Sequence, residues 1–443
     1  MKKLFLTVLS VCFLCHIQAQ ETLTLENCIR MGIENNLMLK SGRNELDKNR
    51  YAISENRANL LPKLNAYARL NDNFDPPVSV TDGRSFGNHY NVTNTLRLNS
   101  SVGLQLTLPL YNQTIYTSMG IVKLVDQLGR LSYEKAKRDL ALNITKMYYI
   151  GQVTMEQIGL VKGNITRLEE LKAITKALYE NDMTLEIDVQ RIDINLQNLK
   201  VQYDNALAML EQQLNTLKYI IDYPAEKEIC LVPANTDEIE KMELSGLDYS
   251  LYEFEILNKK ITMAEKQKQL ISSGYLPSLT LTGNFGFSAF TDKYKNWFHS
   301  GPSNHWYRSA GLGLTLSIPV FDGLDKHNKI QKAKIDIANS KLMQENTRKD
   351  LETEYVNATK DLMTQQRNLG TNKKNYQLAE DVYNVTSDRY KEGIANMTEV
   401  LQDEMRMTEA QNHYLNAFLN YRLSSLTIMK LTGATDRMIS TFK

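Results

Sequence analysis

Residues 362–401 read LMTQQRNLGTNKKNYQLAEDVYNVTSDRYKEGIANMTEVL, and this stretch decides the fold. Its large apolar residues repeat every seven positions, at Leu362, Leu369, Tyr376, Tyr383 and Tyr390. A heptad repeat is typical of a coiled-coil seam rather than of a helix packed into a globular core. The seam stops at Gly393, a residue that readily takes the left-handed conformation that ends a helix. A second helical run follows, from Met397 to about Leu431.

The helix that leads into this turn is long. No proline follows Pro319, and the segment is rich in Lys, Glu, Gln, Asn, Ala and Leu. At 1.5 Å per residue, a helix from Asp322 to Tyr390 would be roughly 100 Å long, which no compact domain contains. We therefore expect a long antiparallel helical hairpin with its tip at Gly393.

The same hairpin occurs earlier in the chain, over about 111–221. A shift of 211 positions places its tip, Asn181-Asp182, on Glu392-Gly393. Either Asn181 or Asp182 would take the left-handed conformation, which Asn and Asp tolerate better than other residues with side chains. Self-similarity on this scale indicates a duplicated architecture.

Each half also contains two segments in which apolar and polar residues alternate, at about 64–74, 96–110, 279–290 and 309–320. Period-two alternation predicts strands with one apolar and one polar face. Each pair of strands is preceded by a helix, at 25–60 and 249–273, which ends near the Leu-Pro pair at Pro62 or Pro277.

Such strands suit either the wall of a transmembrane barrel or one half of an ordinary sandwich. Four strands are too few to close a barrel or to build a sandwich, so we expect their open edges to pair with other copies. Trp297 and Trp306 lie at the loop between the last two strands, as an aromatic girdle at the membrane interface or as ordinary loop aromatics.

The order of these segments gives the domain organisation. The first repeat covers 20–221 and has its hairpin at about 112–221. A linker at 222–247 precedes the second repeat, 248–432, with its hairpin at about 322–431. A tail follows at 433–443. The fold class is mainly α with a small β part, in a duplicated helix-strand-strand-helix-helix repeat.

The first 19 residues are predicted to be an export signal peptide. Lys2 and Lys3 precede an apolar run at 4–14, and Ala19 offers a small residue for cleavage. Removing both lysines leaves 50 basic against 51 acidic residues, which argues against a nucleic-acid partner. The cysteines that remain, Cys28 and Cys230, could pair but are more simply two separate thiols.

The one match to an enzyme motif lies in the wrong structural setting. Residues 83–87 match GxSxG, but they lie in a polar loop between strands instead of between a buried strand and a helix. The histidines show no metal-ligand spacing. We predict no enzymatic activity, no cofactor and no metal site.

Taken together, the export signal, the order of the elements and their duplication resemble the TolC-like family of outer-membrane efflux proteins. The resemblance rests on Pro62 and Pro277, on the strand ends 108–111 and 318–321, and on the tip run 389–401. It implies a homotrimer whose strands form one 12-stranded transmembrane β-barrel, continuous with a long α-helical barrel in the periplasm. It also implies an exit duct in contact with outer-membrane lipid and joined to a periplasmic adaptor and an inner-membrane transporter of the RND, ABC or MFS type.

The resemblance further implies a periplasmic constriction lined by acidic residues, with the hairpin tips as the adaptor contact. Glu399 takes the position of the first family acid, and Asp188 is its counterpart in the first repeat. The second acid is Gln402 here, next to Asp403, which puts a doubled acidic ring in doubt. The full set of gate candidates also includes Tyr179 and Tyr390. These tyrosines either hydrogen-bond across neighbouring hairpins to hold the closed state or, more simply, only continue the packed seam.

Both acids also admit a simple structural reading, as carboxylates favoured by the helix dipole at a helix start. For the whole protein, the alternative to a duct is a periplasmic coiled-coil adaptor or spacer. Drugs, metal ions and secreted proteins all remain open as cargo.

Overall fold

The computed structural model describes residues 21–82, 87, 90–94, 96–235, 245–297 and 305–441. The predicted signal peptide, 1–19, lies outside these residues, as does most of the GxSxG segment. The helices are α1 Leu25–Asn35, α2 Leu37–Ala58, α3 Gln113–Glu180, α4 Glu186–Ile221, α5 Tyr252–Ser273, α6 Asp325–Lys391, α7 Met397–Leu431 and α8 Ala434–Thr441. The strands are β1 Glu21–Leu23, β2 Lys63–Asp72, β3 Val78–Asp82, β4 Tyr90–Asn94, β5 Leu98–Tyr111, β6 Ile229–Leu231, β7 Ser278–Thr291 and β8 Trp306–Ser317.

The duplication is visible in the element bounds. A shift of 211 carries α3 onto α6 and α4 onto α7 to within a residue or two at each end. It also superimposes the left-handed residues: Asp182 (φ 56°) on Gly393 (φ 73°), and Asp222 (φ 53°) on Gly433 (φ 68°). The two halves therefore use the same turns, with aspartate in the first half where the second has glycine.

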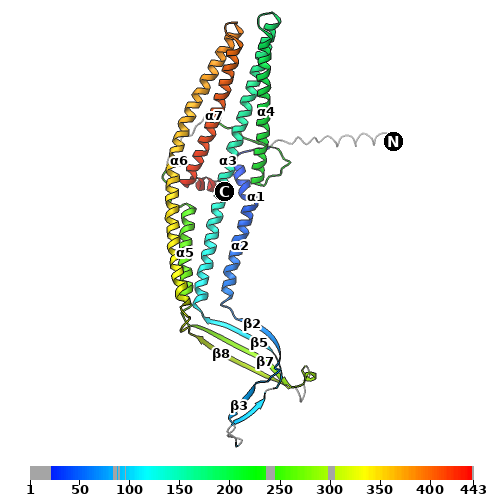
Figure 1. Cartoon of the computed structure of the whole chain (residues 1–443), viewed down its shortest axis with the longest axis vertical. Coiled ribbons are helices and arrows are strands. Elements are labelled where there is room, and N and C mark those ends of the chain that lie inside the picture. Colours follow the sequence, from blue (N-terminus) through cyan, green and yellow to red (C-terminus); the bar gives the residue numbers. More distant parts are fainter. Residues whose placement is uncertain are drawn as a thin grey trace, which may run out of the picture. The chain divides into compact units, whose positions relative to one another are not determined.

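The chain divides into two compact units, and each is described by itself. The first contains Met1–Asn44, Leu131–Glu255 and Glu345–Lys443, and the second contains Glu45–Arg130 and Ile256–Gln344. In the first unit, α3 turns back into α4 and α6 into α7, and Figure 1 shows both tips at the same end. The ion pair Lys172–Asp193 (2.5 Å) joins α3 to α4, and the hydrogen bond from Thr386 to Asp403 (2.8 Å) joins α6 to α7.

The predicted heptad seam is the core of the second hairpin. Leu362, Leu369, Tyr383 and Tyr390 are all buried, and they pack with residues of α7 such as Val400, Met407 and Phe418. Burying large side chains along one line gives these long helices their stability, because an isolated helix draws little from propensity alone.

At the other end of its hairpins, the first unit has a small mixed core. Strand β1 pairs with β6 in parallel, and Leu23 and Leu231 of these strands pack with Ile29 and Ile221. Cys28 lies in this core, where burial raises the pKa of its thiol to about 12, and both it and Cys230 are free thiols. The predicted linker thus contributes a strand, and the predicted tail forms the helix α8.

The expectation of a single helix over 25–60 is wrong, because the helix is interrupted at Asn36. The Asn36 side chain accepts hydrogen bonds from the amides of Met38 and Leu39, at 3.0 and 3.2 Å, and so caps α2. Its amide group donates to the carbonyl oxygen of Ile220 at 2.9 Å, close to the end of α4. A tertiary contact therefore decides where the first helix breaks.

A buried ion pair fixes the start of α5 against α3 in the same unit. The guanidinium of Arg138, fully buried, donates to both carboxylate oxygens of Glu253, at 2.6 and 3.2 Å. Burial opposes ionisation of Glu253, but the bonds from Arg138 outweigh it and lower the pKa of this carboxyl. A bidentate arginine–carboxylate pair adds geometric specificity as well as energy.

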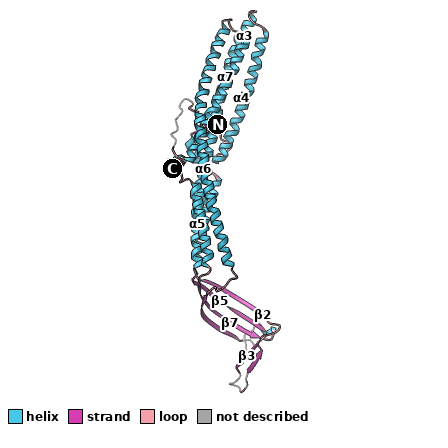
Figure 2. Ribbon diagram, turned by 60° about the vertical axis from the view of Figure 1, so that its left-hand side comes forward, coloured by secondary structure: helices cyan, strands magenta, loops and turns pink. Residues whose placement is uncertain are grey.

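The second unit is built on a four-stranded antiparallel sheet in the order β2-β5-β7-β8, drawn in magenta in Figure 2. The register places Leu104, Phe285 and Ala310 side by side, followed on the opposite face by Gln105, Asn284 and Gly311. One face is therefore apolar across the strands, as the alternation predicts, and much of it is exposed.

Two prolines shape the ends of these strands. Because proline has no amide hydrogen to donate to a neighbour, β8 stops at Ser317, short of Pro319 and of the expected end at 320. Pro109 is accommodated inside β5 by a shift of register against β7 between Pro109 and Tyr111.

The expectation of only four strands is incomplete. Strands β3 and β4 form a further antiparallel hairpin between β2 and β5, with Val80 opposite Val92. Its strands have five residues each and carry many polar residues, so their alternation is too short to stand out in the sequence. Among the described helices, none is long and apolar enough to cross a membrane.

A charged cluster joins the strand ends farthest from the helices of this unit. Arg97 donates to both carboxylate oxygens of Asp72, at 2.6 and 3.1 Å, and to the hydroxyl of Tyr294 at 2.7 Å. The indole of Trp297 donates to the hydroxyl of Ser100. The segment after β7 is thereby held against β2 and β5, and it places Trp297 at the outer end of the apolar face.

Candidate functional site

The candidate site lies at the hairpin tips of the first unit. Asp182 and Gly393 supply the left-handed residue after α3 and α6. At each tip the following amide donates to the carbonyl oxygen five residues back, at 2.9 Å in the first repeat and 2.8 Å in the second. This is the Schellman closure of a helix, and it directs the chain sharply back. Asn181 and Glu392, beside these residues, are exposed.

Glu399 lies in the first turn of α7, which begins at Met397. The side chain of Asn396 accepts a hydrogen bond from the Glu399 amide at 2.9 Å, and its own amide group donates to the Glu399 carboxylate at 2.8 Å. Asn396 thus caps α7 through its side-chain oxygen, and its side-chain amide also holds the acid at the third helical position. Glu399 therefore has the structural role considered from the sequence, and its carboxylate is still exposed to solvent.

Asp188 occupies the same position in α4 but has different partners. The residue before α4 is Leu185, whose side chain makes no cap. Asp188 instead accepts hydrogen bonds from Thr184 at 3.0 Å and from Arg191 at 3.2 Å. The same guanidinium nitrogen of Arg191 donates to Thr398 at 3.2 Å. Asp188 is thus tied through Arg191 to the tip of the second hairpin.

Gln402 and Asp403, one helical turn after Glu399, differ in their exposure to solvent. Gln402 is exposed. The Asp403 side chain points toward the other helix of its own hairpin. Its carboxylate accepts hydrogen bonds from Thr386 of α6 at 2.8 Å and from Arg406 of α7 at 3.3 Å. As a result, the Glu399 carboxylate is more accessible than that of Asp403.

The two equivalent tyrosines also differ. Tyr390 is buried and donates its hydroxyl to Thr175 of α3 at 3.2 Å, so that it packs in the seam and also links the two hairpins. Tyr179 has 40% of its surface exposed. The expectation that both tyrosines continue a packed seam therefore holds for Tyr390 and not for Tyr179 within one chain.

A buried polar network between α3 and α7 was missed by the sequence reasoning. Asn164 donates to Thr408 at 2.9 Å and to Gln411 at 2.8 Å. Glu404 is only 4% exposed and accepts a hydrogen bond from Thr408 at 3.0 Å, with Arg167 of α3 nearby. Burial raises the pKa of Glu404, and the hydrogen bond and the arginine oppose this only in part.

A signal for this network was present in the sequence. Met397, Glu404 and Gln411 are seven residues apart, so two polar residues occupy positions of a heptad seam. Polar residues at such positions commonly specify which helices pair.

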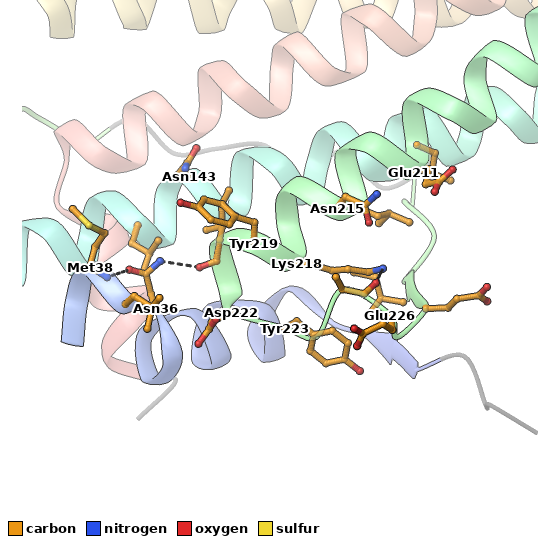
Figure 3. Close-up of a pocket in the computed structure, with 18 of the residues that line it drawn as sticks. Asn36, Met38, Asn143, Glu211, Asn215, Lys218, Tyr219, Asp222, Tyr223 and Glu226 are labelled. Carbon is orange, nitrogen blue, oxygen red and sulfur yellow. Dashed lines mark hydrogen bonds between the residues drawn. The ribbon is translucent and has the colours of Figure 1, made fainter. Parts of the chain in front are cut away.

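A cavity of about 1200 Å³ lies at the opposite end of the first hairpin. Leu207 and Leu214 form part of its apolar wall, and Lys218, which donates to the carbonyl oxygen of Ala225 at 3.1 Å, crosses one side of it. Figure 3 shows Asn36, Lys218 and Glu226 around this space.

Across the described ranges, no group of three or more His, Cys, Asp or Glu side chains could hold a metal ion. The arrangement instead offers exposed carboxylates near a sharp turn, supported by hydrogen bonds between two hairpins. Such a surface can attract cations and contact another protein.

Comparison with known proteins gives consistent results. Residues 257–434 match the family model described as outer membrane efflux protein. The outer membrane protein TolC of Vibrio cholerae is 21% identical over 421 residues, which cover 90% of this chain and 88% of that protein.

Solved structures share the fold. The Campylobacter jejuni CmeC outer membrane channel superimposes with a TM-score of 0.71 at 18% identity, covering 94% of this chain and 89% of that one. The open state of the Neisseria gonorrhoeae MtrE outer membrane channel gives 0.72 at 19% identity, covering 92% and 88%. Residues 257–434 are therefore similar to the outer membrane efflux protein family, and the chain shares the fold of outer-membrane efflux channels along nearly all its length. Both findings confirm the resemblance to the TolC-like family.

Proposed function

We propose that this protein is the outer-membrane channel of a tripartite efflux or type I secretion system. It would conduct substrates passively from the pump across the periplasm and the outer membrane, without catalysis and without a cofactor. The working form is a homotrimer in which three four-stranded sheets close one 12-stranded barrel, and the helical hairpins of the three copies form a barrel in the periplasm.

The four-stranded sheet carries this proposal. Its outer strands, β2 and β8, each have a partner on one side only among the described residues. Its apolar face is exposed, and Leu312 on the edge strand β8 is 81% accessible. An open edge beside an exposed apolar face is an aggregation hazard in water. Pairing of edges between copies would remove the hazard, with the apolar face toward lipid and the polar face toward a water-filled lumen.

The hairpin tips are proposed as the contact for a periplasmic adaptor, which in turn joins an inner-membrane transporter of the RND, ABC or MFS type. Asn181, Asp182, Glu392 and Gly393 lie at the turns, where their side chains or backbone are exposed. Rigid turns at the ends of long helices offer a partner a preformed surface, which lowers the entropic cost of binding.

The proposed gate consists of Asp188, Glu399, Gln402, Asp403, Tyr179 and Tyr390. Within it, the exposed carboxylate of Glu399 is assigned to the pore, where three copies would favour cations. Asp403 and Tyr390 support it from inside the hairpins through their bonds to Thr386 and Thr175.

Membrane extraction and single-channel recording test this function together. The full-length protein should remain with the outer membrane after osmotic shock, dissolve only in detergent, and conduct ions when purified into a planar bilayer. Release by osmotic shock alone, as a protein that conducts nothing, would favour the periplasmic adaptor or spacer.

A further inference from the structure

The polar face of the four-stranded sheet carries charge of one sign. On this face, the strand register places Arg69 beside Ser101, and Ser101 beside Ser288. Lys63 lies on the same face, earlier in β2. Within the described strands β2, β5, β7 and β8, no aspartate or glutamate shares this face, because the alternation of β2 puts Asp72 on the opposite one. The charged groups of the polar face are therefore all cationic.

The side chain of Tyr67 lies over two glycines on the same face. Tyr67 is opposite Gly103, which is opposite Gly286 on the next strand. A Cβ added to Gly103 would lie 2.9 Å from the Tyr67 hydroxyl oxygen, and one added to Gly286 would lie 3.3 Å from it. Either Cβ would also meet a backbone carbonyl oxygen at 2.6 Å. The two glycines thus leave room for the tyrosine, and an aromatic side chain that covers glycines in a sheet stabilises it.

Arg69 is held against this tyrosine. The two residues are separated by one position in β2 and therefore project from the same face. The guanidinium carbon of Arg69 lies 5.0 Å from the centre of the Tyr67 ring, which is a cation–π contact. Among the described residues, no carboxylate pairs with Arg69, and its neighbours across the strands are the hydroxyl residues Ser101 and Ser288. The arginine charge is thus positioned by an aromatic ring and is not neutralised by an acid.

Side chains of this face would point into the lumen of the proposed barrel. With strands about 4.8 Å apart and tilted by about 40°, a 12-stranded barrel has a radius of about 12 Å at its backbone. An arginine that extends inward brings its guanidinium within about 10 Å of the axis, which is about one Debye length at 0.1 M salt. The charge of Arg69 in three copies would therefore act across the whole width of the lumen.

We propose that Arg69, positioned by Tyr67, gives the barrel section of the channel a preference for organic anions, such as carboxylates and sulfonates. Lys63 adds a second cation at the start of β2, where its ammonium group donates to Asn59 at 3.1 Å. The inference rests on the proposed channel function and deepens it by naming a class of substrate. A cationic wall concentrates anions in the lumen and lowers the electrostatic barrier to their passage.

This preference is opposite in sign to the one proposed for Glu399. The two charged groups belong to different units of the chain, and each acts over about one Debye length. Glu399 would add its own cation preference to any recording of the whole channel. Replacing it with glutamine therefore isolates the contribution of the barrel, and the test is made in this Glu399→Gln background.

Single-channel recording of the full-length trimer tests the proposal. In a gradient of potassium chloride at low salt, Arg69→Gln should raise the permeability ratio of potassium to chloride. Three unit charges within about 10 Å of the axis correspond to a change of about two- to fivefold. Potassium benzoate, the salt of an organic anion, should show the same change. Lys63→Gln should shift the ratio in the same direction, and Arg69→Lys should keep the parental ratio because it keeps the charge.

Arg308→Gln is the matched control. Arg308 of β8 is opposite Phe287 of β7 and therefore lies on the apolar face, away from the lumen. Its replacement removes the same charge from each copy and should leave the permeability ratio unchanged. Equal shifts in Arg308→Gln and Arg69→Gln would indicate a general effect of surface charge and would overturn the proposal.

The positioning role of Tyr67 is tested separately. Tyr67→Leu removes the aromatic ring beside the guanidinium, while Arg69 keeps its charge. The permeability ratio should therefore shift in the same direction as in Arg69→Gln, but by less. Tyr67→Phe keeps the ring and should behave as the parent. A parental ratio in Tyr67→Leu would overturn the positioning role.

The failure of this inference can be told from the failure of the proposed function. If Arg69→Gln and Lys63→Gln form conducting trimers with the parental permeability ratio, the anion preference is wrong and the channel function stands. If the parental protein forms no conducting trimer, both are overturned.

Discussion

The turn after α7 allows a stability prediction with an internal control. Gly433 has φ 68°, and a Cβ atom added to it would lie 2.4 Å from a carboxylate oxygen of Asp248. The other oxygen of that carboxylate is held by the amide and the hydroxyl of Ser250, at 2.8 and 2.7 Å. In Gly433→Ala, the carboxylate would have to rotate away and lose these bonds.

The expected cost follows from these contacts. The left-handed conformation costs a residue with a Cβ about 1–2 kcal/mol, and each lost hydrogen bond adds about 0.5–1.5 kcal/mol. Part of this is offset because alanine restricts the unfolded chain more than glycine does. We expect Gly433→Ala to lower the free energy of unfolding by about 2–4 kcal/mol.

Two matched variants separate the contributions. Gly393 has φ 73° with nothing within 4 Å of an added Cβ, so Gly393→Ala should show the backbone cost alone, about 1 kcal/mol. Asp222 occupies the position equivalent to Gly433 in the first repeat, and Asp222→Gly should be neutral or slightly stabilising.

The assay is urea unfolding of the detergent-purified protein, followed by its helical circular dichroism. Equal midpoints for Gly433→Ala and Gly393→Ala would refute the argument from the Asp248 contact.

Three further predictions concern the site and the long helices. Glu399→Gln should reduce cation preference and divalent block in single-channel recordings, because it removes three charges from the proposed pore while an amide can still pair with the cap; unchanged selectivity would remove the case for a gate there. Glu404→Gln should weaken the dependence of the free energy of unfolding on pH. Burial raises the pKa of this carboxyl in the folded protein, so its protonated form favours folding. That contribution is complete below about pH 4.3, the value for an unfolded glutamate, and is lost as the pH rises through the higher folded pKa. Urea midpoints across this pH range measure the effect, and parallel curves for variant and parent would contradict it. Leu369→Pro should prevent trimer assembly, measured by native gel, because proline inside α6 costs about 3 kcal/mol or more; a normal trimer would argue against a continuous helix.

The amino-acid sequence by itself determined the long helices, the duplicated tips and the alternation of the strands. The reason is that periodicity is a local property: a heptad repeat such as that of Leu369 and Tyr390 shows which side of a helix is covered, and alternation shows which face of a strand is apolar. The left-handed positions could be inferred in the same way, and Asp182 takes the conformation that Gly393 made probable for its equivalent.

Only the tertiary structure decided which surfaces meet. The pairing of β5 with β7 joins the two halves of the chain in one sheet, and the break at Asn36 depends on a carbonyl group 184 residues away. The equivalent acids Glu399 and Asp188 look alike in the sequence, yet one accepts a hydrogen bond from the N-cap side chain of Asn396 and the other binds an arginine. Local patterns report how a segment is covered but not by what, because the partner of a buried polar group is chosen by packing between distant parts of the chain.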